Sequence, residues 1–315
     1  MSAFSFTAPR FTDEDSIREQ EELPAAERER IEDECFGRNF VVIEETPELI
    51  ETALCEIIIH LQGIACKPAY DEAMRLVPHL VEQESAPIRF LRCERFCAAR
   101  AAKRLVKYWE MRLILFEEKA FLPMRLDGAL QGDIETMAIV PDLHFITGKD
   151  EHGRLILFGN KARLDFHRYS RRSVNRCVWY HIHINTVNDV EAQKRGMVGV
   201  GFFRINSPKQ FDRINLKWYI ALLQEALPIK LVCWHICHTP EFFKVVFPMM
   251  KFMMGKELRL HSKIHHGAEG SVLADLARYG VQRHNILKCM GGTFDLNIND
   301  WINERRRIEV FLPAL

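Results

Sequence analysis

The sequence lacks the short motifs that mark the common nucleotide-binding and hydrolytic enzymes. It contains no P-loop, no G-x-S-x-G turn and no G-x-G-x-x-G before a helix, because Gly196, Gly199 and Gly201 stand in the wrong order. It also lacks the paired C-x-x-C units of a structural zinc site. We therefore expect a protein that is not an enzyme and has no catalytic residue, metal or cofactor.

Excess charge and long apolar runs are absent as well. The 43 Lys and Arg residues balance 43 Asp and Glu residues, whereas nucleic-acid binders carry a basic excess, so we expect no nucleic-acid partner. No apolar run reaches the ~18 residues of a membrane helix, and the N-terminus has no secretory pattern. Nine cysteines without a repeated spacing indicate reduced thiols. A soluble, cytoplasmic protein is expected.

The balanced charge hides two halves of opposite sign. Residues 1–150 hold 18 basic and 29 acidic residues, a net of −11, and residues 151–315 hold 25 and 14, a net of +11. The segment 12–34 alone has 11 acidic and three basic residues. We interpret it as a solvated acidic helix, with contact to a basic surface or to a protein partner as the alternatives.

Helical periodicity dominates the first half of the chain. Apolar residues recur at helical spacing over 47–61, 71–83 and 98–116, and basic residues such as Arg104 and Arg112 lie outside the apolar stripe of the last segment. We divide the chain into an acidic, partly flexible segment (1–43), a helical subdomain (44–145), a ligand-binding domain (146–295) and a tail (296–315).

Strands and helices alternate in the second half. Short apolar strands are predicted at 155–158, 198–205 and 231–237, with helices at 170–187 and 210–227 between them. Leu231–Cys237 is apolar on both faces, which is typical of a central strand that is covered on both sides. The order predicts an α/β fold with parallel neighbouring strands.

The segment 241–255 is apolar nearly all round and holds four methionines. It is either a helix buried on every side, or a helix that faces an apolar cavity on one side and solvent or lipid on the other. Basic residues follow it, and apolar residues beside basic ones suit contact with an anionic membrane surface. These basic residues are Lys256, Arg259, His261, Lys263, His265 and His266.

Histidines and cysteines offer a weaker alternative, a metal or acid–base site. The candidates are His181-x-His183, Cys233-x3-Cys237-His238 and His265-His266. Position 181 reads as helical, where residues i and i+2 diverge, and no acidic residue stands at a ligand-like spacing. We favour structural histidines.

In this order the motifs resemble the CRAL-TRIO lipid-binding and lipid-transfer family over about 85–295. Phe90-Leu91-Arg92 and Tyr108-Trp109-Glu110-Met111-Arg112 resemble its helical subdomain, and Gly153-Arg154-Leu155-Ile156 its first strand. Ala226-Leu227-Pro228 through Thr239-Pro240 resembles the approach to its mobile gate helix, which 241–255 matches. Ser262-Lys263-Ile264-His265 and Met290-Gly291-Gly292-Thr293 resemble the following strand and the end signature.

The resemblance implies an N-terminal helical subdomain followed by an α/β domain, whose mixed sheet floors an apolar lipid pocket closed by the gate helix. It implies a carrier that holds one hydrophobic ligand and exchanges it at membranes when the gate opens. The implied ligand-binding residues are Phe158, Gly199, Gly201, Phe203, Trp234, Ile236, Lys263 and His265. The implied gate residues are Phe242, Phe243, Val246, Phe247, Met250 and Met253.

The ligand stays open among a phospholipid, a phosphoinositide and an isoprenoid-type lipid. Phosphatidylinositol-binding members carry Pro-Glu before the third strand and hydroxyl residues on the second, where this chain has Pro228-Ile229 and Gly199 and Gly201. The alternative function is a CRAL-TRIO adaptor or signalling module, for example in small-GTPase regulation, without transfer activity.

Overall fold

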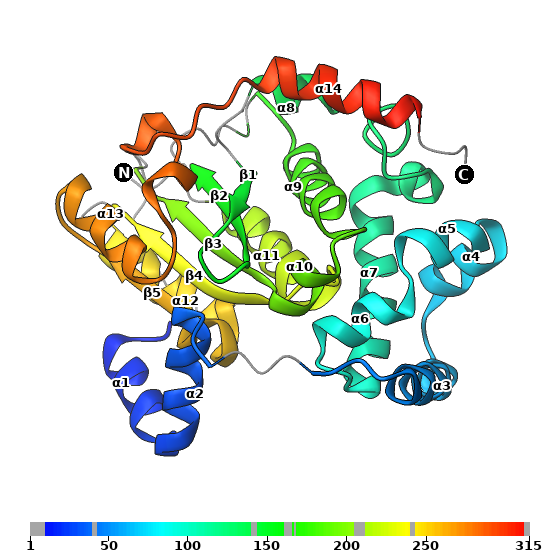
Figure 1. Ribbon diagram of the computed structural model, residues 1–315, viewed down its shortest axis with the longest axis horizontal. Coiled ribbons are helices and arrows are strands. Elements are labelled where there is room, and N and C mark those ends of the chain that lie inside the picture. The colour runs from blue at the N-terminus through cyan, green and yellow to red at the C-terminus, as the bar shows by residue number, and fades with distance from the viewer. Residues whose placement is uncertain are drawn as a thin grey trace, which may run out of the picture.

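A five-stranded mixed sheet forms the centre of the second half of the chain. The computed structural model describes residues 10–39, 43–139, 144–160, 166, 168–204, 212–239 and 243–311. The strands follow one another in the order β1-β2-β3-β4-β5, with β1 antiparallel to β2 and all other neighbours parallel (Figure 1). They are β1 (Phe145–Lys149), β2 (Leu155–Asn160), β3 (Met197–Phe202), β4 (Leu231–Cys237) and β5 (Ser262–His265).

The strand predictions are confirmed within a few residues, and one strand was missed. Every residue of β2, β3 and β4 is buried, as expected for strands covered on both faces. The expected strand at 198–205 ends at Phe202, and Ile205 lies outside the described residues. The antiparallel strand β1 was not predicted, because Phe145–Lys149 alternates too briefly to be distinguished from a loop.

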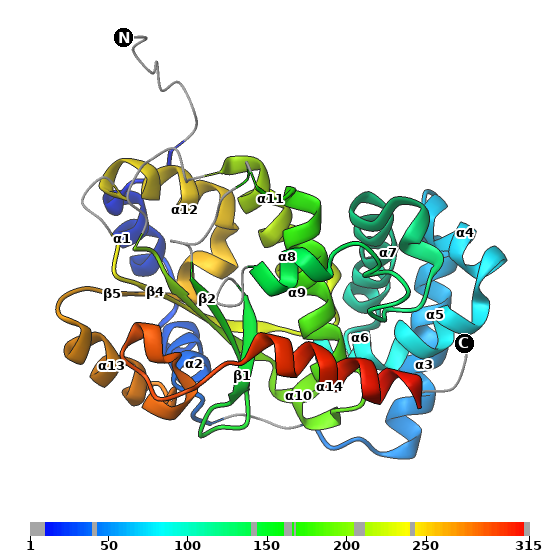
Figure 2. The same cartoon turned by 90° about the horizontal axis from the view of Figure 1, so that it is seen from above.

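The crossover helices cover one face of the sheet. Because the parallel strands are added in sequence order, right-handed crossovers place every connecting helix on the same side. These helices are α9 (Arg171–Thr186), α11 (Arg213–Ala221) with the π-turn η4 (Leu222–Ala226), and α12 (Phe243–Leu260). The short helix α10 (Val190–Arg195) follows α9 and packs against α6 and α9. Figure 2 shows α9, α11 and α12 above the sheet.

Helices from both ends of the chain cover the opposite face. Ile31 and Cys35 of α2 and Val272 and Leu276 of α13 share a core with β2, β3 and β4. These helices are α2 (Ala25–Phe36) and α13 (Glu269–Arg278); α1 (Asp13–Glu21) precedes α2, and the short 3-10 turns η5 (Arg283–Asn285) and η6 (Lys288–Met290) lead to α14 (Ile298–Val310). The acidic segment is therefore packed against the protein, and the prediction of a solvated helix is wrong for α2.

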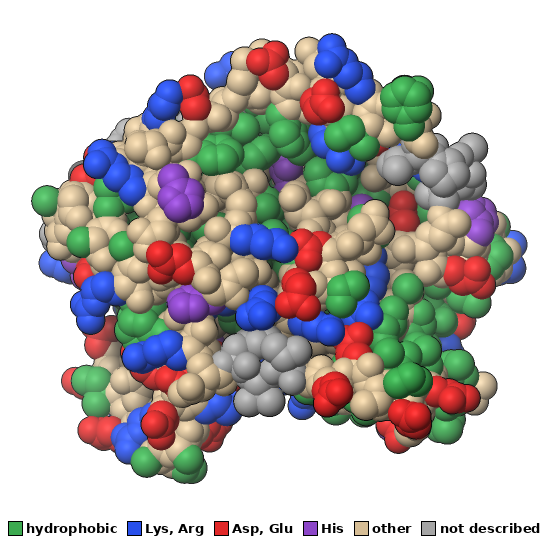
Figure 3. Space-filling view, viewed as in Figure 1, with side chains coloured by type: hydrophobic (Ala, Val, Ile, Leu, Met, Phe, Trp, Pro, Cys, Tyr) green, Lys and Arg blue, Asp and Glu red, His purple; other side chains and the backbone are tan. Residues whose placement is uncertain are grey.

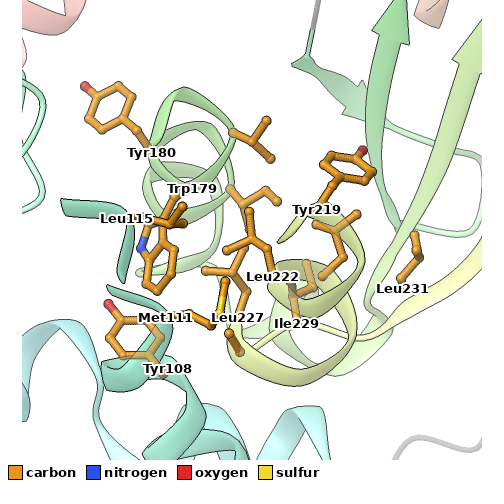
Figure 4. Close-up of a cluster of buried hydrophobic side chains, with 14 of the residues drawn as sticks. Tyr108, Met111, Leu115, Trp179, Tyr180, Tyr219, Leu222, Leu227, Ile229 and Leu231 are labelled. Carbon is orange, nitrogen blue, oxygen red and sulfur yellow. The ribbon is translucent and has the colours of Figure 1, made fainter. Parts of the chain in front are cut away.

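The helical subdomain packs beside the sheet through α7, which contacts both α9 and η4. Figure 4 shows side chains of α7 (Tyr108, Met111 and Leu115) meeting Trp179 of α9 and Leu227 in one apolar core. Its helices are α3 (Pro47–Gly63), α4 (Pro68–Leu76), α5 (Pro78–Glu84), α6 (Pro87–Cys93), α7 (Ala98–Phe116), η1 (Glu117–Phe121) and α8 (Ile134–Ile139). The single helix expected at 71–83 is broken before Pro78, since proline disfavours a helical residue ahead of it.

The position of Arg112 contradicts the expectation that it lies outside the packed side of α7. Its guanidinium is fully buried, donates to the Glu84 carboxylate at 2.6 Å and to the Ala120 carbonyl at 2.7 Å, and lies over the Trp109 ring. Arg104 is half-buried against Glu94 and the Leu227 carbonyl. Both cations lie at the packed side of α7 because carboxylates and carbonyls satisfy them there.

Within the described part of the chain, no single helix is long and apolar enough to cross a bilayer. Helices α3 and α4 reach that composition only when taken together, across a bend of 117°.

The surface carries charges of both signs, with acidic side chains at the lower left of Figure 3, where α1 and α2 lie.

Candidate functional site

The two faces of the sheet carry different rows of side chains. Leu157, Gly199 and Trp234 form one row across β2, β3 and β4, and Gly159, Gly201 and Ile236 form the next row on the same face. This is the face that α9, α11 and α12 cover. It therefore has three glycines near the carboxyl ends of the strands, where ligands bind in open α/β sheets.

The glycines create a hollow, and aromatic rings lie in it. A Cβ atom at Gly201 would stand 2.8 Å from the Phe203 ring and 3.4 Å from the Trp234 indole nitrogen. A Cβ at Gly199 would stand 3.0 Å from the same indole. The space above the glycines is thus taken by Trp234 and Phe203 in this conformation. Their movement would open room next to the backbone.

Helix α12 lies over these rings as a cover. The Phe243 ring packs 5.3 Å from Phe203 and 5.2 Å from Phe247, centroid to centroid. Met250 and Val246 are buried, and Phe247 and Met253 are partly buried. Phe242 lies outside the described residues. The same helix exposes Phe252, Lys244 and Lys256, so it is not buried on every side. Its role as a gate stays a prediction.

A break divides α12 near its end. Gly255 has φ 71° and ψ 167°, a conformation that only glycine adopts readily. The Arg259 guanidinium reaches back across this break and donates to the Lys251 carbonyl at 3.0 Å. Pro248 adds a second irregularity, because it has no N–H to donate within the helix. The predicted segment 241–255 thus ends at a hinge-like break, and the helix continues to Leu260.

The eight predicted ligand residues do not line one surface. Gly199, Gly201, Phe203, Trp234 and Ile236 gather beneath α12. Phe158, Lys263 and His265 lie on the opposite face, because they stand one position out of step along the pleat. Phe158 packs on Phe202, Lys263 pairs with Glu32 of α2 at 2.5 Å, and His265 lies under α13. In this conformation the last three residues cannot share a pocket with the first five.

His265 belongs to a buried histidine pair. Its Nε2 lies 2.9 Å from Nδ1 of His235, and both rings contact Tyr279. Burial lowers the pKa of His235 well below its ordinary value and lowers the pKa of His265, so both rings are neutral at pH 7. Burial also lowers the pKa values of His181 and His183 in α9 to about 3. Among the described residues, no three His, Cys, Asp or Glu side chains are grouped as metal ligands.

The basic residues after the gate segment meet the acidic α2. Glu34 accepts from His261 at 3.1 Å, from Lys230 at 3.1 Å and from Arg95 at 2.8 Å. Burial alone would raise the pKa of Glu34, but these three partners hold it far below its usual range. The same contact raises the pKa of His261 against the effect of burial. Sequence reasoning missed Glu34, whose only signal is its place in the acidic segment.

A polar cleft of about 600 Å³ lies at the junction of α2, α6, α7, η4 and α12. Its lining includes Arg100, Lys103, Arg104, Lys107 and Lys230. Most of these cations already pair with carboxylates such as Glu94 and Glu34. The cleft therefore differs in character from the apolar layer beneath α12, which we take as the candidate site.

Part of the chain is similar to a known protein family. Residues 154–299 match the family model of a divergent CRAL/TRIO domain, which spans β2 to the start of α14. In a search of curated proteins, no sequence matches the chain. Among solved structures, the crystal structure of Sfh5 aligns with a TM-score of 0.43 at 14% identity, covering 77% of this chain and 97% of that one.

Proposed function

We propose that residues 154–299, which match the model of a divergent CRAL/TRIO domain, form a lipid-binding domain, and that the chain is a non-catalytic carrier that holds one hydrophobic lipid and exchanges it at membranes. The family is a lipid-binding one. Transfer, with α12 as the gate, is our proposal for this member. We propose that the chain is cytoplasmic and exchanges its lipid at membrane surfaces that face the cytoplasm.

The observation that supports this function best is the apolar layer between α12 and the glycine-rich rows of the sheet. A lipid tail gains ~0.8 kcal/mol for each methylene removed from water, so a tail that displaces the aromatic rings above the glycines would be stabilised there. Trp234 and Phe203 would move aside, and the Gly199 and Gly201 positions would let the ligand approach the backbone. The rings would close the site again when it empties.

The ligand class follows from what surrounds the layer. The layer holds Trp234, Phe203 and Ile236 on the sheet side and Phe243 on the α12 side, and the two basic candidates Lys263 and His265 face away from it. A site with so few charged groups favours a weakly polar lipid over a phosphoinositide. We therefore propose a neutral or isoprenoid-type lipid ahead of phosphatidylinositol.

A vesicle assay tests the carrier function. The full chain is mixed with donor vesicles that hold a fluorescent lipid and with unlabelled acceptor vesicles, and the movement of label is followed with time. We expect transfer that scales with protein concentration. A chain that moves none of a panel of phospholipids, sterols and isoprenoids is not a transfer protein.

Two matched variants connect transfer with α12. Phe247 is partly buried and stacks on Phe243 at 5.2 Å, and Phe36 of α2 is partly buried and stacks on Tyr279 at 4.2 Å on the other face of the sheet. Phe247→Asp should abolish transfer while the chain stays folded, and Phe36→Asp should leave transfer intact. If Phe247→Asp unfolds the chain instead, α12 is a structural helix rather than a gate.

A further inference from the structure

Helix α1 lies along α12, in contact with the proposed gate (Figures 1 and 2). The Lys251 ammonium donates to the Asp13 carboxylate at 2.7 Å and to the Ser16 hydroxyl at 2.7 Å. The Arg259 guanidinium donates twice to Glu19, at 2.9 and 2.6 Å, and stacks 3.8 Å from the Phe11 ring. The Phe11 N–H also donates to the Pro248 carbonyl at 2.9 Å.

These contacts converge on the break in α12. Arg259 spans the break by donating to the Lys251 carbonyl, and Glu19 in turn pairs with Arg259. Asp13 holds the ammonium of the same Lys251. The side chains of α1 therefore contact α12 on both sides of the irregular turn, and these contacts must break before α12 can swing away from α1.

The acid-to-base pattern continues into α2. Glu32 pairs with Lys263, and Glu34 pairs with Lys230 and His261. A strip of carboxylates thus covers a strip of cations around the second half of α12. The opposite charges of the two halves of the chain, −11 and +11, meet at this contact.

Helix α1 is the detachable part of the strip. It buries none of its own residues, whereas α2 buries Ile31 and Cys35 in the core of the sheet. Its capping box, in which Thr12 and Asp15 bond each other's backbone N–H groups, is local and survives undocking. Ion pairs with one exposed partner are weak and salt-sensitive, and Asp13 is such a partner with a side chain 92% exposed.

We propose that the basic surface formed by Lys251 and Arg259 is the docking site for an anionic bilayer, and that α1 is an internal competitor whose carboxylates occupy it. This inference rests on the proposed carrier function and names its membrane and its regulation. A bilayer fits better than a charged protein or nucleic acid, because the exposed Phe252 stands next to Lys251 on the same helix. An apolar ring beside cations suits the lipid interface, where insertion and charge attraction add.

Vesicle flotation of the full chain tests the proposal, with phosphatidylcholine vesicles and with vesicles that also contain phosphatidylserine. Asp13→Lys/Glu19→Lys removes both ion pairs between α1 and α12. Binding to the phosphatidylserine vesicles should rise about tenfold or more, because each freed cation near an anionic surface strengthens binding severalfold. Binding to pure phosphatidylcholine should change little, and added salt should reverse the gain.

Glu14→Lys/Glu22→Lys is the matched control, with the same charge change in α1 and at its C-cap residue. Glu14 and Glu22 are exposed and make no ion pair within the described part of the chain. If this control binds phosphatidylserine vesicles as well as the first pair does, net charge explains the effect and the proposal is wrong. It is equally wrong if the first pair binds no better than the unchanged chain.

Two further variants guard against misfolding and locate the surface. Asp13→Asn/Glu19→Gln removes the charges without adding new ones, and should raise binding in the same direction by a smaller factor. Adding Lys251→Glu and Arg259→Glu to the first pair should return binding to the original level; if binding stays high, another surface meets the membrane. Flotation needs no bound lipid ligand, so a chain that docks by this rule and transfers no lipid would overturn the carrier function alone.

Discussion

Gly255→Ala tests whether the break in α12 is a required feature of the closed conformation. The glycine has φ 71° and ψ 167°, and a Cβ atom added there would meet nothing within 4 Å. The cost is therefore one of backbone strain, about 1–3 kcal/mol, without a steric clash. Alanine returns ~0.5–1 kcal/mol by restricting the unfolded chain, which leaves a net loss of between about 0 and 2.5 kcal/mol, and we take about 1–2 kcal/mol as the expected loss.

That loss falls on the broken form of α12. If the helix opens to exchange lipid, a penalty of about 1–2 kcal/mol on the closed form raises the open population about 5- to 30-fold. We expect Gly255→Ala to lower the free energy of unfolding in urea by this amount and to accelerate lipid exchange by a similar factor. Both are measured on the full chain.

Gly270→Ala is the control for this prediction. Gly270 lies in α13, is also free of neighbours within 4 Å of an added Cβ, and has no left-handed φ. Alanine there should leave stability unchanged or raise it by up to ~1 kcal/mol. The reasoning is refuted if Gly255→Ala behaves as Gly270→Ala does, because α12 then accepts an ordinary residue at the break.

Three further predictions follow from buried charge, surface exposure and titration. Arg112→Met should lower the free energy of unfolding in urea by about 3–5 kcal/mol, because it leaves the buried Glu84 without its cation. Adding Glu84→Leu to this variant should recover much of that loss. If the single and the double variant lose the same free energy, packing rather than charge explains the effect. Phe252→Asp, on the exposed side of α12, should weaken vesicle binding without lowering the melting temperature, while Ile59→Asp on α3 should change neither; equal effects on binding would remove Phe252 from the interface. Burial lowers the pKa values of His181 and His183 in the folded chain to about 3, whereas in the unfolded chain their pKa is 6.5. As the pH falls below 6.5, the unfolded chain therefore binds protons that the folded chain does not. The free energy of unfolding is highest above pH 6.5 and falls by up to about 1.4 kcal/mol per pH unit per histidine between pH 6.5 and the folded pKa. Urea midpoints at pH 7 and pH 5.5 that agree would contradict this.

Regular periodicity made part of the fold predictable. Helix α7 begins and ends where its apolar spacing does, at Ala98 and Phe116, and β4 coincides with the apolar run Leu231–Cys237. The alternation of strands and helices predicted parallel neighbours, and β2 to β5 confirm them. These elements are long or strongly patterned, so local sequence carries their signal.

Other features depend on tertiary partners that a linear pattern does not reveal. Arg112 reads as a surface cation because Glu84 and the Ala120 carbonyl, which satisfy it, come from other elements. Lys263 and His265 were predicted with Trp234 and Ile236, but the register of β5 on β4 turns them to the other face. A strand's pleat reverses with each residue, so a pocket prediction needs the register as well as the strand.

The acidic segment 12–34 is a further case in which the sequence does not reveal the tertiary partners. Its composition favours a solvated helix, and only the fold places Asp13 and Glu19 opposite Lys251 and Arg259, more than two hundred residues away. The opposite charge of the two halves was visible in the sequence, but not which residues meet. That pairing is what makes α1 a regulator in our proposal.

Native mass spectrometry of the full chain, purified without detergent from cells or after incubation with a membrane extract, tests the central claim most directly. We predict a species heavier than the bare 36.8 kDa chain by the mass of one lipid, and that lipid should be released when the chain is denatured. A chain that shows only its bare mass after exposure to every membrane extract tried does not carry a lipid, and the account of α12 as a gate would then be wrong.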